Sequence, residues 1–316
     1  MFFQNKIYFD TAFIDGHSHK VYSKYSPDKN SNNVTLAQTG TKLSNIGVLI
    51  IHEDGTISHE NVNEVPYDED LADETMTVYR NKQNYYVDKE MNEFIKQISE
   101  SFSDELNRVI GYTPFPLTVY KNITESTQSS TQLSRIGENA LCNLVCDSFR
   151  ELGGTDITIM NAGSIRTDID EGDITYQELI DTMPYSNDVL IKELTGQNIL
   201  DALEFGVRSL PNPTSRFPQV SGITFKVDVS IDSSVIVDEN ENFVKVGGER
   251  RVYDVKINGK NLDLNKYYTI SSNSFILDGG DGYTMLYPCE IIQTAIGIDN
   301  DLLQTYIKEN LNGEIP

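Results

Sequence analysis

Two segments of the chain repeat apolar residues every three or four positions, which is the spacing of an amphipathic helix. In the first segment they are Met91, Phe94, Ile95, Ile98, Phe102, Leu106 and Val109. In the second they are Leu141, Leu144, Val145, Phe149 and Leu152. Gly111 and Pro114 end the first repeat, and Gly153 with Gly154 ends the second. We therefore predict helices over 91–109 and 139–152.

Shorter patterns predict strands and further helices. Ile157–Met160 is a short apolar run typical of a buried strand, and residues 223–229 alternate apolar and polar side chains, as a half-buried strand does. Thr175 and Glu178 have the spacing of a capping box that begins a helix, and Thr195 is expected to cap the next helix.

Turn signals add a hairpin and a loop. Asn258-Gly259 predicts a two-residue hairpin turn between strands at Val252–Ile257 and Leu262–Ile270. The acidic, serine-rich stretch Ser230–Glu241 predicts a surface loop.

These elements divide the chain into three parts. Residues 1–65 carry short strands and loops, and 66–110 hold a charged stretch followed by the first helix, which we interpret as a connector. Residues 111–316 alternate helices and strands, so we expect them to form the larger domain.

Charge excludes several classes of partner. The chain has 25 Lys and Arg against 48 Asp and Glu, a net charge of −23. Polyanions repel such a chain, which argues against nucleic acid and anionic membrane surfaces. The longest apolar run, Ile46–Ile51, is far shorter than the roughly 20 residues of a membrane span. The N-terminus lacks a basic region and contains Asp10 and Asp15, so it does not resemble a signal peptide.

Three cysteines are too few, and odd in number, for a disulfide framework. Cys142 and Cys146 lie four residues apart on the second predicted helix. We expect both to be small buried apolar residues.

The histidines are confined to one end of the sequence, at His17, His19, His52 and His59. Residues 60–316 therefore supply no histidine base or metal ligand, and catalysis there would use carboxylates, Lys or Tyr. His17 and His19 follow an apolar run, and at a strand end residues i and i+2 project to the same side. They are either ligands of one metal centre or ordinary polar histidines.

A first candidate site is Asn161-Ala-Gly-Ser-Ile-Arg166, directly after the strand predicted at 157–160. A glycine-containing turn there would expose backbone N–H groups, and the planar fork of Arg166 is suited to an anion. Arg135, before the second helix, is another candidate anion ligand. The alternative is a simple turn with surface arginines.

A second candidate is Phe275-Ile-Leu-Asp-Gly-Gly-Asp281-Gly282. Its glycines allow positive φ and close backbone approach. Phe275 offers a stacking face for a base, and Asp281 offers a carboxylate for ribose hydroxyls. Tyr185, after the helix that begins at Thr175, is a second exposed-aromatic candidate. The alternatives are an ordinary glycine turn and a core or rim tyrosine.

Seven short motifs follow one another along almost the whole chain. They are G-H-S-H at 16–19, R-x-x-E at 135–138, N-x-G-x-I-R at 161–166, M-P-Y at 183–185, L-T-G at 194–196, Q-V-S-G at 219–222 and F-x-x-x-G-G-D-G at 275–282. In this order and approximate spacing they resemble the 5′-nucleotidase family, which includes bacterial UDP-sugar hydrolases and 2′,3′-cyclic-nucleotide phosphodiesterases. Each motif alone is weak, but the set is specific.

The resemblance implies a metallophosphatase domain with two divalent metal ions of the Zn or Mn type. A long helix joins that domain to a C-terminal nucleotide-binding domain with a mixed sheet, so the implied fold class is α+β. On this pattern His17 and His19 are metal ligands. The implied substrate ligands are Arg135 and Arg166 for phosphate, Asn161 and Gly163 in the loop that holds phosphate and base, Tyr185 and Phe275 around the base, and Asp281 at the ribose. The family also implies an extracellular, periplasmic or cell-surface location.

The sequence departs from the family pattern in several places. Ser164 stands where glycine is usual, Tyr185 replaces a commoner phenylalanine, and Thr131 replaces a further arginine of some bacterial members. The upstream D-x-H, G-D and G-N-H-[DE] motifs, which hold the remaining metal ligands and the catalytic histidine, are missing. Two histidines without those partners should not hold a dinuclear centre stably.

We therefore expect a chain that represents part of such an enzyme. Residues 1–65 would be the C-terminal remnant of a metallophosphatase β-sandwich, 66–110 the connector, and 111–316 the substrate-binding domain. No catalytic residue is assigned, and the chain alone is expected to bind a small-molecule nucleotide or nucleoside without hydrolysing it. The motifs are compatible with AMP-like, UDP-sugar and cyclic substrates alike.

Two other hypotheses share parts of this pattern. A stand-alone nucleotide- or nucleoside-binding module would have the same site and no catalytic role. An amidohydrolase would share the H-x-H pair at His17 and His19, but it needs histidine ligands far downstream, and no histidine follows His59.

Overall fold

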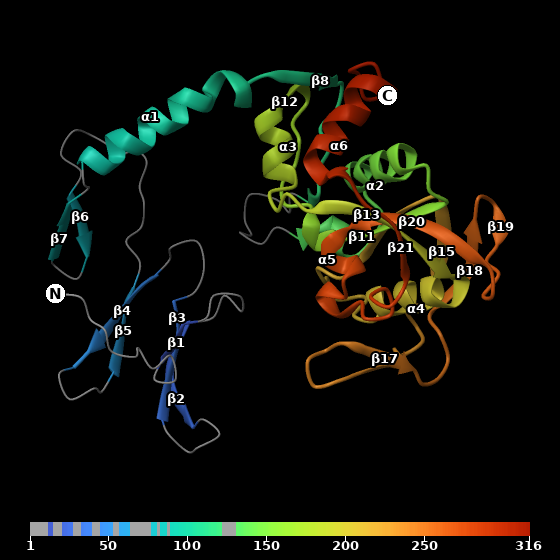
Figure 1. Cartoon of the computed structure of the whole chain (residues 1–316), viewed down its shortest axis with the longest axis horizontal. Coiled ribbons are helices and arrows are strands. Elements are labelled where there is room, and N and C mark those ends of the chain that lie inside the picture. The colour runs from blue at the N-terminus through green and yellow to red at the C-terminus, as the bar shows by residue number, and fades with distance from the viewer. Residues whose placement is uncertain are drawn as a thin grey trace. The chain divides into compact units, whose positions relative to one another are not determined.

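The computed structural model describes residues 12–14, 21–27, 33–39, 45–52, 57–63, 77–80, 83–86, 89–121 and 131–316. The chain divides into two compact units, Met1–Ser99 and Glu100–Pro316, which can be followed from blue to red in Figure 1. The finer division at residues 65 and 110 stays a prediction.

The described part of the first unit contains seven short strands, of which the five before residue 65 were predicted and the two within 66–110 were not, and it ends within helix α1. They are β1 (Ala12–Ile14), β2 (Val21–Pro27), β3 (Asn33–Thr39), β4 (Asn45–Ile51), β5 (Ile57–Asn63), β6 (Thr77–Arg80) and β7 (Gln83–Tyr86). A sheet ordered β1-β3-β2 has β1 parallel to β3, and the last four strands form two antiparallel pairs. The identity of residues 1–65 as a metallophosphatase remnant stays a prediction. His17 and His19 lie outside the described residues.

Helix α1 (Lys89–Leu106) confirms the first predicted helix but ends three residues early. Val109 instead begins β8 (Val109–Thr113), which pairs antiparallel with β12 (Gly172–Thr175). The apolar stripe of α1 is exposed over more than two fifths of each side chain at Phe94, Ile95, Ile98 and Phe102.

The second unit is built on a five-stranded sheet ordered β14-β11-β20-β13-β21. Its strands are β11 (Ile157–Asn161), β13 (Asp188–Thr195), β14 (Pro218–Ser221), β20 (Tyr267–Asn273) and β21 (Glu290–Ile298). Strands β11 and β20 run parallel, and the other neighbours are antiparallel. This mixed sheet confirms the predicted α+β class.

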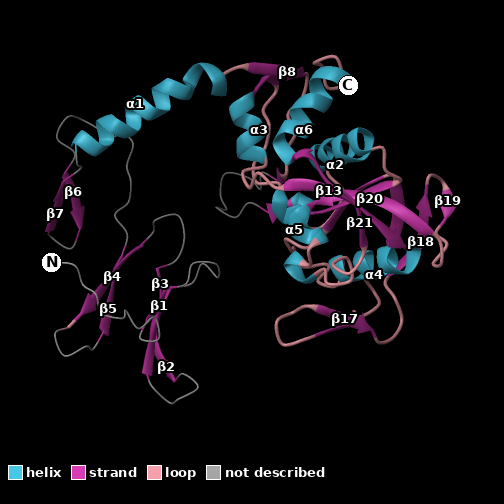
Figure 2. Ribbon diagram, viewed as in Figure 1, coloured by secondary structure: helices cyan, strands magenta, loops and turns pink. Residues whose placement is uncertain are grey.

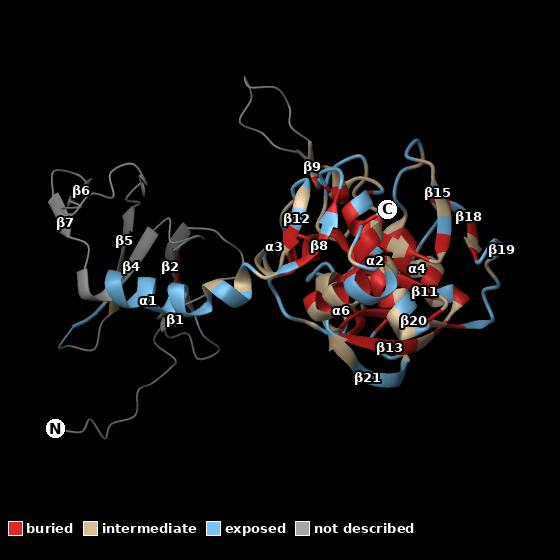
Figure 3. Cartoon of the chain, turned by 90° about the horizontal axis from the view of Figure 1, so that it is seen from above, coloured by how far each residue is buried: buried red, intermediate tan, exposed pale blue. Residues whose placement is uncertain are grey.

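Helices cover both faces of this sheet (Figure 2). Helices α2 (Ala140–Gly153) and α6 (Asp299–Thr305) share one core, and α4 (Gly196–Gly206) belongs to the other. Side chains of β11 alternate between the two, since Ile159 packs with α4 and Met160 packs with α2. Figure 3 shows the buried residues gathered in these layers.

The predicted starts of α3 and α4 and the predicted end of α2 are confirmed. Thr175 and Glu178 form a capping box at the start of α3 (Tyr176–Thr182), and Thr195 with Asn198 does the same for α4. Helix α2 ends at Gly154, whose φ of 59° is left-handed and suits glycine.

The hairpin prediction is correct at its turn and wrong in its second strand. Asn258 and Gly259 have φ of 51° and 74°, as a hairpin turn requires. They join β18 (Val252–Ile257) to the two-residue β19 (Lys260–Asn261) rather than to a strand over 262–270. The chain continues into β20 of the central sheet, where Ile270 is fully buried. Strand β18 also pairs with β15 (Ile223–Val227).

The loop predicted at 230–241 contains a strand. Residues Val235–Val237 form β16, which pairs with β17 (Phe243–Val246). The ring of Phe243 packs edge-on against Phe205 of α4, with centroids 5.9 Å apart. This contact attaches the hairpin to the core.

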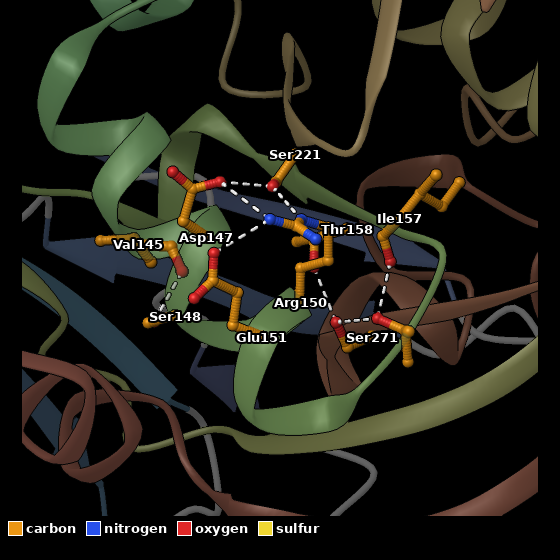
Figure 4. Close-up of polar contacts among 10 residues, drawn as sticks. Val145, Asp147, Ser148, Arg150, Glu151, Ile157, Thr158, Ser221 and Ser271 are labelled. Carbon is orange, nitrogen blue, oxygen red and sulfur yellow. Dashed lines mark hydrogen bonds and ion pairs between the residues drawn. The ribbon is translucent and has the colours of Figure 1, made fainter. Parts of the chain in front are cut away.

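A polar layer lies between α2 and the central sheet (Figure 4). Arg150 Nε donates to Ser221 Oγ at 2.6 Å, and the Ser221 hydroxyl donates to the Asp147 carboxylate. Arg150 also pairs with Glu151 at 3.1 Å. A cavity of about 580 Å³ lies beside this layer, between α2 and the β14–β15 segment.

The remaining elements of the second unit are short. They are β9 (Tyr120–Lys121), β10 (Thr131–Gln132), α5 (Ser274–Leu277), and the single turns η2 (Leu133–Arg135), η3 (Ala162–Ser164), η4 (Gly280–Gly282) and η5 (Tyr306–Asn310). Across the described ranges, none of the helices combines the length and apolar character needed to cross a bilayer.

Candidate functional site

The two predicted substrate motifs begin at neighbouring strand ends. Strand β11 ends at Asn161 and β20 ends at Asn273, and because these strands run parallel, both ends lie at the same edge of the sheet. Turn η3 continues from the first residue and helix α5 from the second. Asn273 Nδ2 donates to Asn161 Oδ1 at 3.2 Å, which joins the two motifs directly.

The glycine-rich loop after α5 fixes Asp281. Asp281 has a left-handed φ of 53° and lies close to two glycines with φ of 91° and 88°. A Cβ on Gly280 would lie 2.5 Å from the carbonyl oxygen of Phe275, so glycine is required there. In this loop the Asp281 carboxylate meets the first motif, since Asn161 Nδ2 donates to its Oδ2 at 2.9 Å.

The backbone of the N-x-G-x-I-R motif corrects one prediction. We expected its N–H groups to be exposed to an anion, but four of them donate to protein carbonyls. These are the N–H groups of Ala162, Gly163, Ile165 and Arg166. Gly163 is required by packing instead, because a Cβ would lie 2.8 Å from the Cβ of Ser215. Recognition of an anion at this loop therefore depends on side chains.

Arg166 is held beside the motif's own backbone. Its Nη1 donates to the carbonyl oxygen of Gly163 at 3.3 Å, and its carbonyl accepts from the hydroxyl of Tyr120 at 3.1 Å. The guanidinium carbon lies 6.0 Å from the ring centroid of Tyr185. Two of the predicted site residues, Arg166 and Tyr185, thus lie near each other.

Arg135, at the end of η2, is a half-buried cation with an unsatisfied N–H group. Within the described residues its Nε is buried without a hydrogen-bond partner. Burial lowers the pKa of Arg135, and the nearby positive charge of Arg166 lowers this pKa further. Tyr120, Tyr185 and Asp281 act on it in the opposite direction. Arg135 therefore lies in the same electrostatic neighbourhood as the other candidates.

Two buried glutamines hold the segment that carries Arg135. Gln219, which is 1% exposed, donates from Nε2 to the carbonyls of Ser134 at 2.7 Å and Gly137 at 2.8 Å. Gln132 donates from Nε2 to the carbonyl of Ile165 at 3.0 Å, which connects this segment to the Asn161 loop. The Q-V-S-G motif included the first glutamine, whereas nothing in the sequence singled out Gln132.

The two predicted aromatic ligands both present open ring surface. Tyr185 follows α3 and is 56% exposed, and Phe275 lies on α5 and is 43% exposed. Large aromatic side chains are normally mostly buried, so exposed rings beside polar side chains are available to stack on a flat ligand.

Buried Lys192 holds the backbone on either side of the glycine-rich loop, and the sequence analysis did not identify it. It is 1% exposed, and its Nζ donates to the carbonyls of Leu277 at 2.6 Å and of Leu286 and Tyr287 at 3.3 Å. Asp278 lies 3.6 Å from the same nitrogen. The available signal was a lysine inside the apolar run of β13, since an unpaired charge is not tolerated in a core.

The described residues do not supply a metal centre. They contain no group of three or more His, Cys, Asp and Glu side chains arranged to hold a metal ion. The assignment of His17 and His19 as metal ligands therefore stays a prediction. The candidate site instead offers two guanidinium groups, two aromatic rings, one carboxylate and one amide.

Comparisons with known proteins agree with the motifs. Residues 109–287, more than half of the chain, match the family model described as 5′-nucleotidase, C-terminal domain. The chain is 28% identical over 286 residues to trifunctional nucleotide phosphoesterase protein YfkN of Bacillus subtilis (strain 168), covering 86% of this chain and 17% of that protein. It is 26% identical over 223 residues to a 5′-nucleotidase of Vibrio vulnificus (strain CMCP6), covering 71% and 35%. The matched part is thus well under half the length of these relatives.

A solved structure has a similar fold. The 5′-nucleotidase precursor from Thermus thermophilus matches with a TM-score of 0.56 and 21% identity, over 97% of this chain and 57% of that one. The region matched by the family model contains all seven substrate candidates, from Arg135 to Asp281. The chain therefore belongs to the 5′-nucleotidase family, whose C-terminal domain it carries at residues 109–287.

Proposed function

We propose that the second unit binds a nucleotide, as the substrate-recognition part of a 5′-nucleotidase-type phosphohydrolase. In this proposal Arg135 and Arg166 bind the phosphate, Tyr185 and Phe275 stack on the base, and Asp281 accepts hydrogen bonds from the ribose hydroxyls. Asn161 orients Asp281, and Gly163 allows the loop its close packing.

The observation that carries the proposal is the pair of arginines. Among the described residues no carboxylate lies within ion-pair distance of Arg135 or Arg166, although burial and mutual repulsion act on Arg135. In a chain with a net charge of −23, two unneutralised guanidinium groups at one place are exceptional. A phosphate would supply the missing negative charge and match their planar forks.

The remaining groups fit a nucleoside attached to that phosphate. Stacking of a base on an aromatic side chain contributes about 1–3 kcal/mol. Asp281, in the loop that follows Phe275, adds a carboxylate acceptor whose orientation is fixed by the hydrogen bond from Asn161. Both relatives described above carry names that refer to nucleotide phosphoester chemistry, which agrees with this class of ligand.

Catalysis lies outside this proposal for the described residues, because they offer no fitting metal site. In the family-type reaction two divalent metal ions would activate the attacking water. The part of this chain that we describe would hold and orient the substrate, and we propose that by itself it binds nucleotide without hydrolysing it.

Calorimetric titration of the purified chain with 5′-AMP, adenosine and inorganic phosphate tests this function. We expect AMP to bind more tightly than either fragment, because it engages the arginines and the aromatic rings together. Absence of AMP binding, or AMP binding no tighter than adenosine, would contradict the site. Phosphate release from AMP after addition of Zn²⁺ or Mn²⁺ would contradict recognition without hydrolysis.

A further inference from the structure

The side-chain amide of Asn161 has a polar neighbour at each end. Its Oδ1 accepts from the hydroxyl of Ser164 at 2.6 Å and from Asn273 Nδ2 at 3.2 Å. Its Nδ2 donates to Asp281 at 2.9 Å. Asn161, Ser164 and Asn273 are only 4%, 5% and 1% exposed, so water cannot easily replace these bonds.

The direction of each bond in this network follows from the orientation of the Asn273 amide, where the network begins. Asn273 is the N-cap of α5, and its Oδ1 accepts from the backbone N–H of Ile276 at 3.0 Å. Its Nδ2 must therefore point the other way, where it donates to Ser164 Oγ at 3.0 Å as well as to Asn161. Since Asn273 donates to Asn161 Oδ1, that atom is an acceptor, and the Ser164 hydroxyl therefore donates its hydrogen to it.

The opposite orientation of the Asn161 amide is unfavourable at both ends. It would place the amide NH₂ against the NH₂ group of Asn273, which can only donate. It would also place the carbonyl oxygen against the carboxylate of Asp281, which only accepts when ionised. A buried network of this kind has one arrangement in which all members are satisfied.

We infer that Ser164 and Asn273 are positioning residues that lock the amide of Asn161 so that it donates to Asp281 and thereby aims that carboxylate. The inference rests on the proposed function in one respect, that Asp281 faces the ribose. The network begins at the cap of the helix that carries Phe275 and ends at Asp281. One chain of hydrogen bonds therefore sets the base-stacking ring and the carboxylate relative to each other.

The sharpest test is a double-mutant cycle between Ser164→Ala and Asn161→Ala, read out as affinity for AMP. Loss of one buried hydrogen bond predicts that Ser164→Ala weakens AMP binding about 3- to 10-fold in the otherwise unchanged chain. In the Asn161→Ala background we expect the same substitution to change affinity by less than about 2-fold, because the group it positions is gone. Affinity for inorganic phosphate should not change in either background.

Ser148→Ala is the matched control. Ser148 is equally buried, and its hydroxyl donates to the carbonyl of Val145 within α2 at 2.7 Å. Its replacement should leave AMP affinity unchanged while removing one buried hydroxyl. Equal losses from Ser164→Ala in both backgrounds would mean a general structural effect and would overturn the inference.

A measurement without ligand separates this inference from the proposed function. The side-chain NH₂ signal of Asn161, assigned by its absence in Asn161→Ala, should exchange slowly in the wild-type chain and at least about 10-fold faster in Ser164→Ala. If AMP does not bind at all, the proposed function fails, yet this exchange difference still tests the network. Unchanged exchange in Ser164→Ala would overturn the positioning role.

Discussion

The amide of Asn161 donates a hydrogen bond to the carboxylate of Asp281 at 2.9 Å, across 120 positions of the sequence. This bond joins the loop after β11, which carries Arg166, to the glycine-rich loop after α5. It uses Oδ2 of the carboxylate, so we expect Oδ1 to meet the ribose.

Replacing Asp281 by Asn should test that role. A hydrogen bond to a charged group contributes about 1.5–3 kcal/mol, so AMP affinity should fall roughly 10- to 100-fold. The loss should be small for 2′,3′-dideoxy-AMP, which lacks the ribose hydroxyls. Titration calorimetry with both ligands measures the difference.

Asp278→Asn is the charge-matched control in the same loop. Asp278 has a side chain that is 55% exposed, and it contacts Lys192 at 3.6 Å, which retains its three carbonyl partners in the variant. An equal loss of affinity for AMP and for the dideoxy ligand in Asp281→Asn would show that the carboxylate does not recognise the ribose.

Arg135→Gln should stabilise the free chain and weaken its binding of phosphate and AMP. It removes a half-buried cation that Arg166 repels, so we expect the melting temperature of the free chain to rise by about 1–3 °C. The same change should weaken binding of inorganic phosphate and of AMP roughly 10-fold or more, through loss of a charge-assisted contact. Thermal unfolding and phosphate titration are the two measurements.

Arg150→Gln is the control variant, for which we expect the opposite result. Arg150 is hydrogen-bonded to Ser221 and ion-paired with Glu151, away from the site, so its loss should lower the melting temperature and leave phosphate affinity unchanged. A lower melting temperature for Arg135→Gln would contradict the description of Arg135 as a half-buried cation that Arg166 repels.

Phe275→Leu and Tyr185→Leu should separate aromatic stacking from apolar contact. Each variant should lose about 1–3 kcal/mol of AMP binding, or roughly 5- to 150-fold in affinity, with phosphate affinity unchanged. Both rings are about half exposed, so the stability of the fold should change little. Tyr267→Leu is the control, since Tyr267 is 59% exposed at the start of β20. A Tyr267→Leu effect of the same size would rule out specific stacking.

The local features of the fold followed from the sequence because short-range interactions determine them. The capping boxes at Thr175 and Thr195 need only residues three positions apart, and both formed as predicted. The partner of a strand is a non-local choice. Asn258-Gly259 specified its turn correctly, but burial of Ile270 in the central sheet took the following segment away from the expected hairpin.

The candidate site also has a part that could be predicted from the sequence and a part that could not. The ordered motifs identified its seven candidate residues, but not the contacts that orient them. Ser164 and Asn273 act across 109 positions, and Lys192 reaches carbonyls 85 and more positions away. The direction of such bonds depends on three-dimensional packing, which also explains why the backbone N–H groups expected to bind an anion are occupied by carbonyls.

Lys192→Met should destabilise the second unit and loosen the glycine-rich loop. Removal of the ammonium leaves three carbonyls, two of them in buried contacts, without this donor, so we expect a loss of about 2–4 kcal/mol in the free energy of unfolding by urea. AMP affinity should fall while phosphate affinity is retained, because the arginines lie on other segments. Lys245→Met, at an exposed position, should change neither quantity. A Lys192→Met chain of wild-type stability would contradict a supporting role.

Cys142 and Cys146 should make the fold sensitive to alkaline pH. Both thiols are fully buried on α2, as the sequence predicted, and burial raises the pKa of Cys142 to about 12 and also raises the pKa of Cys146. Below pH 8 the thiols are protonated in the folded and unfolded states alike. Above about pH 8.5 the unfolded chain loses these protons first, so the free energy of unfolding should decrease by about 1.4 kcal/mol per pH unit for each fully ionising thiol.

Urea denaturation between pH 8 and 10, under reducing conditions, measures this slope. The double variant Cys142→Ala, Cys146→Ala loses buried volume and should be less stable at every pH, but its stability should vary less with pH over this range. Tyr306, whose pKa burial raises to about 12, contributes in the same direction at the upper end and is present in both chains. The difference between the two slopes therefore isolates the thiols, and identical slopes would mean that they do not couple folding to alkaline pH.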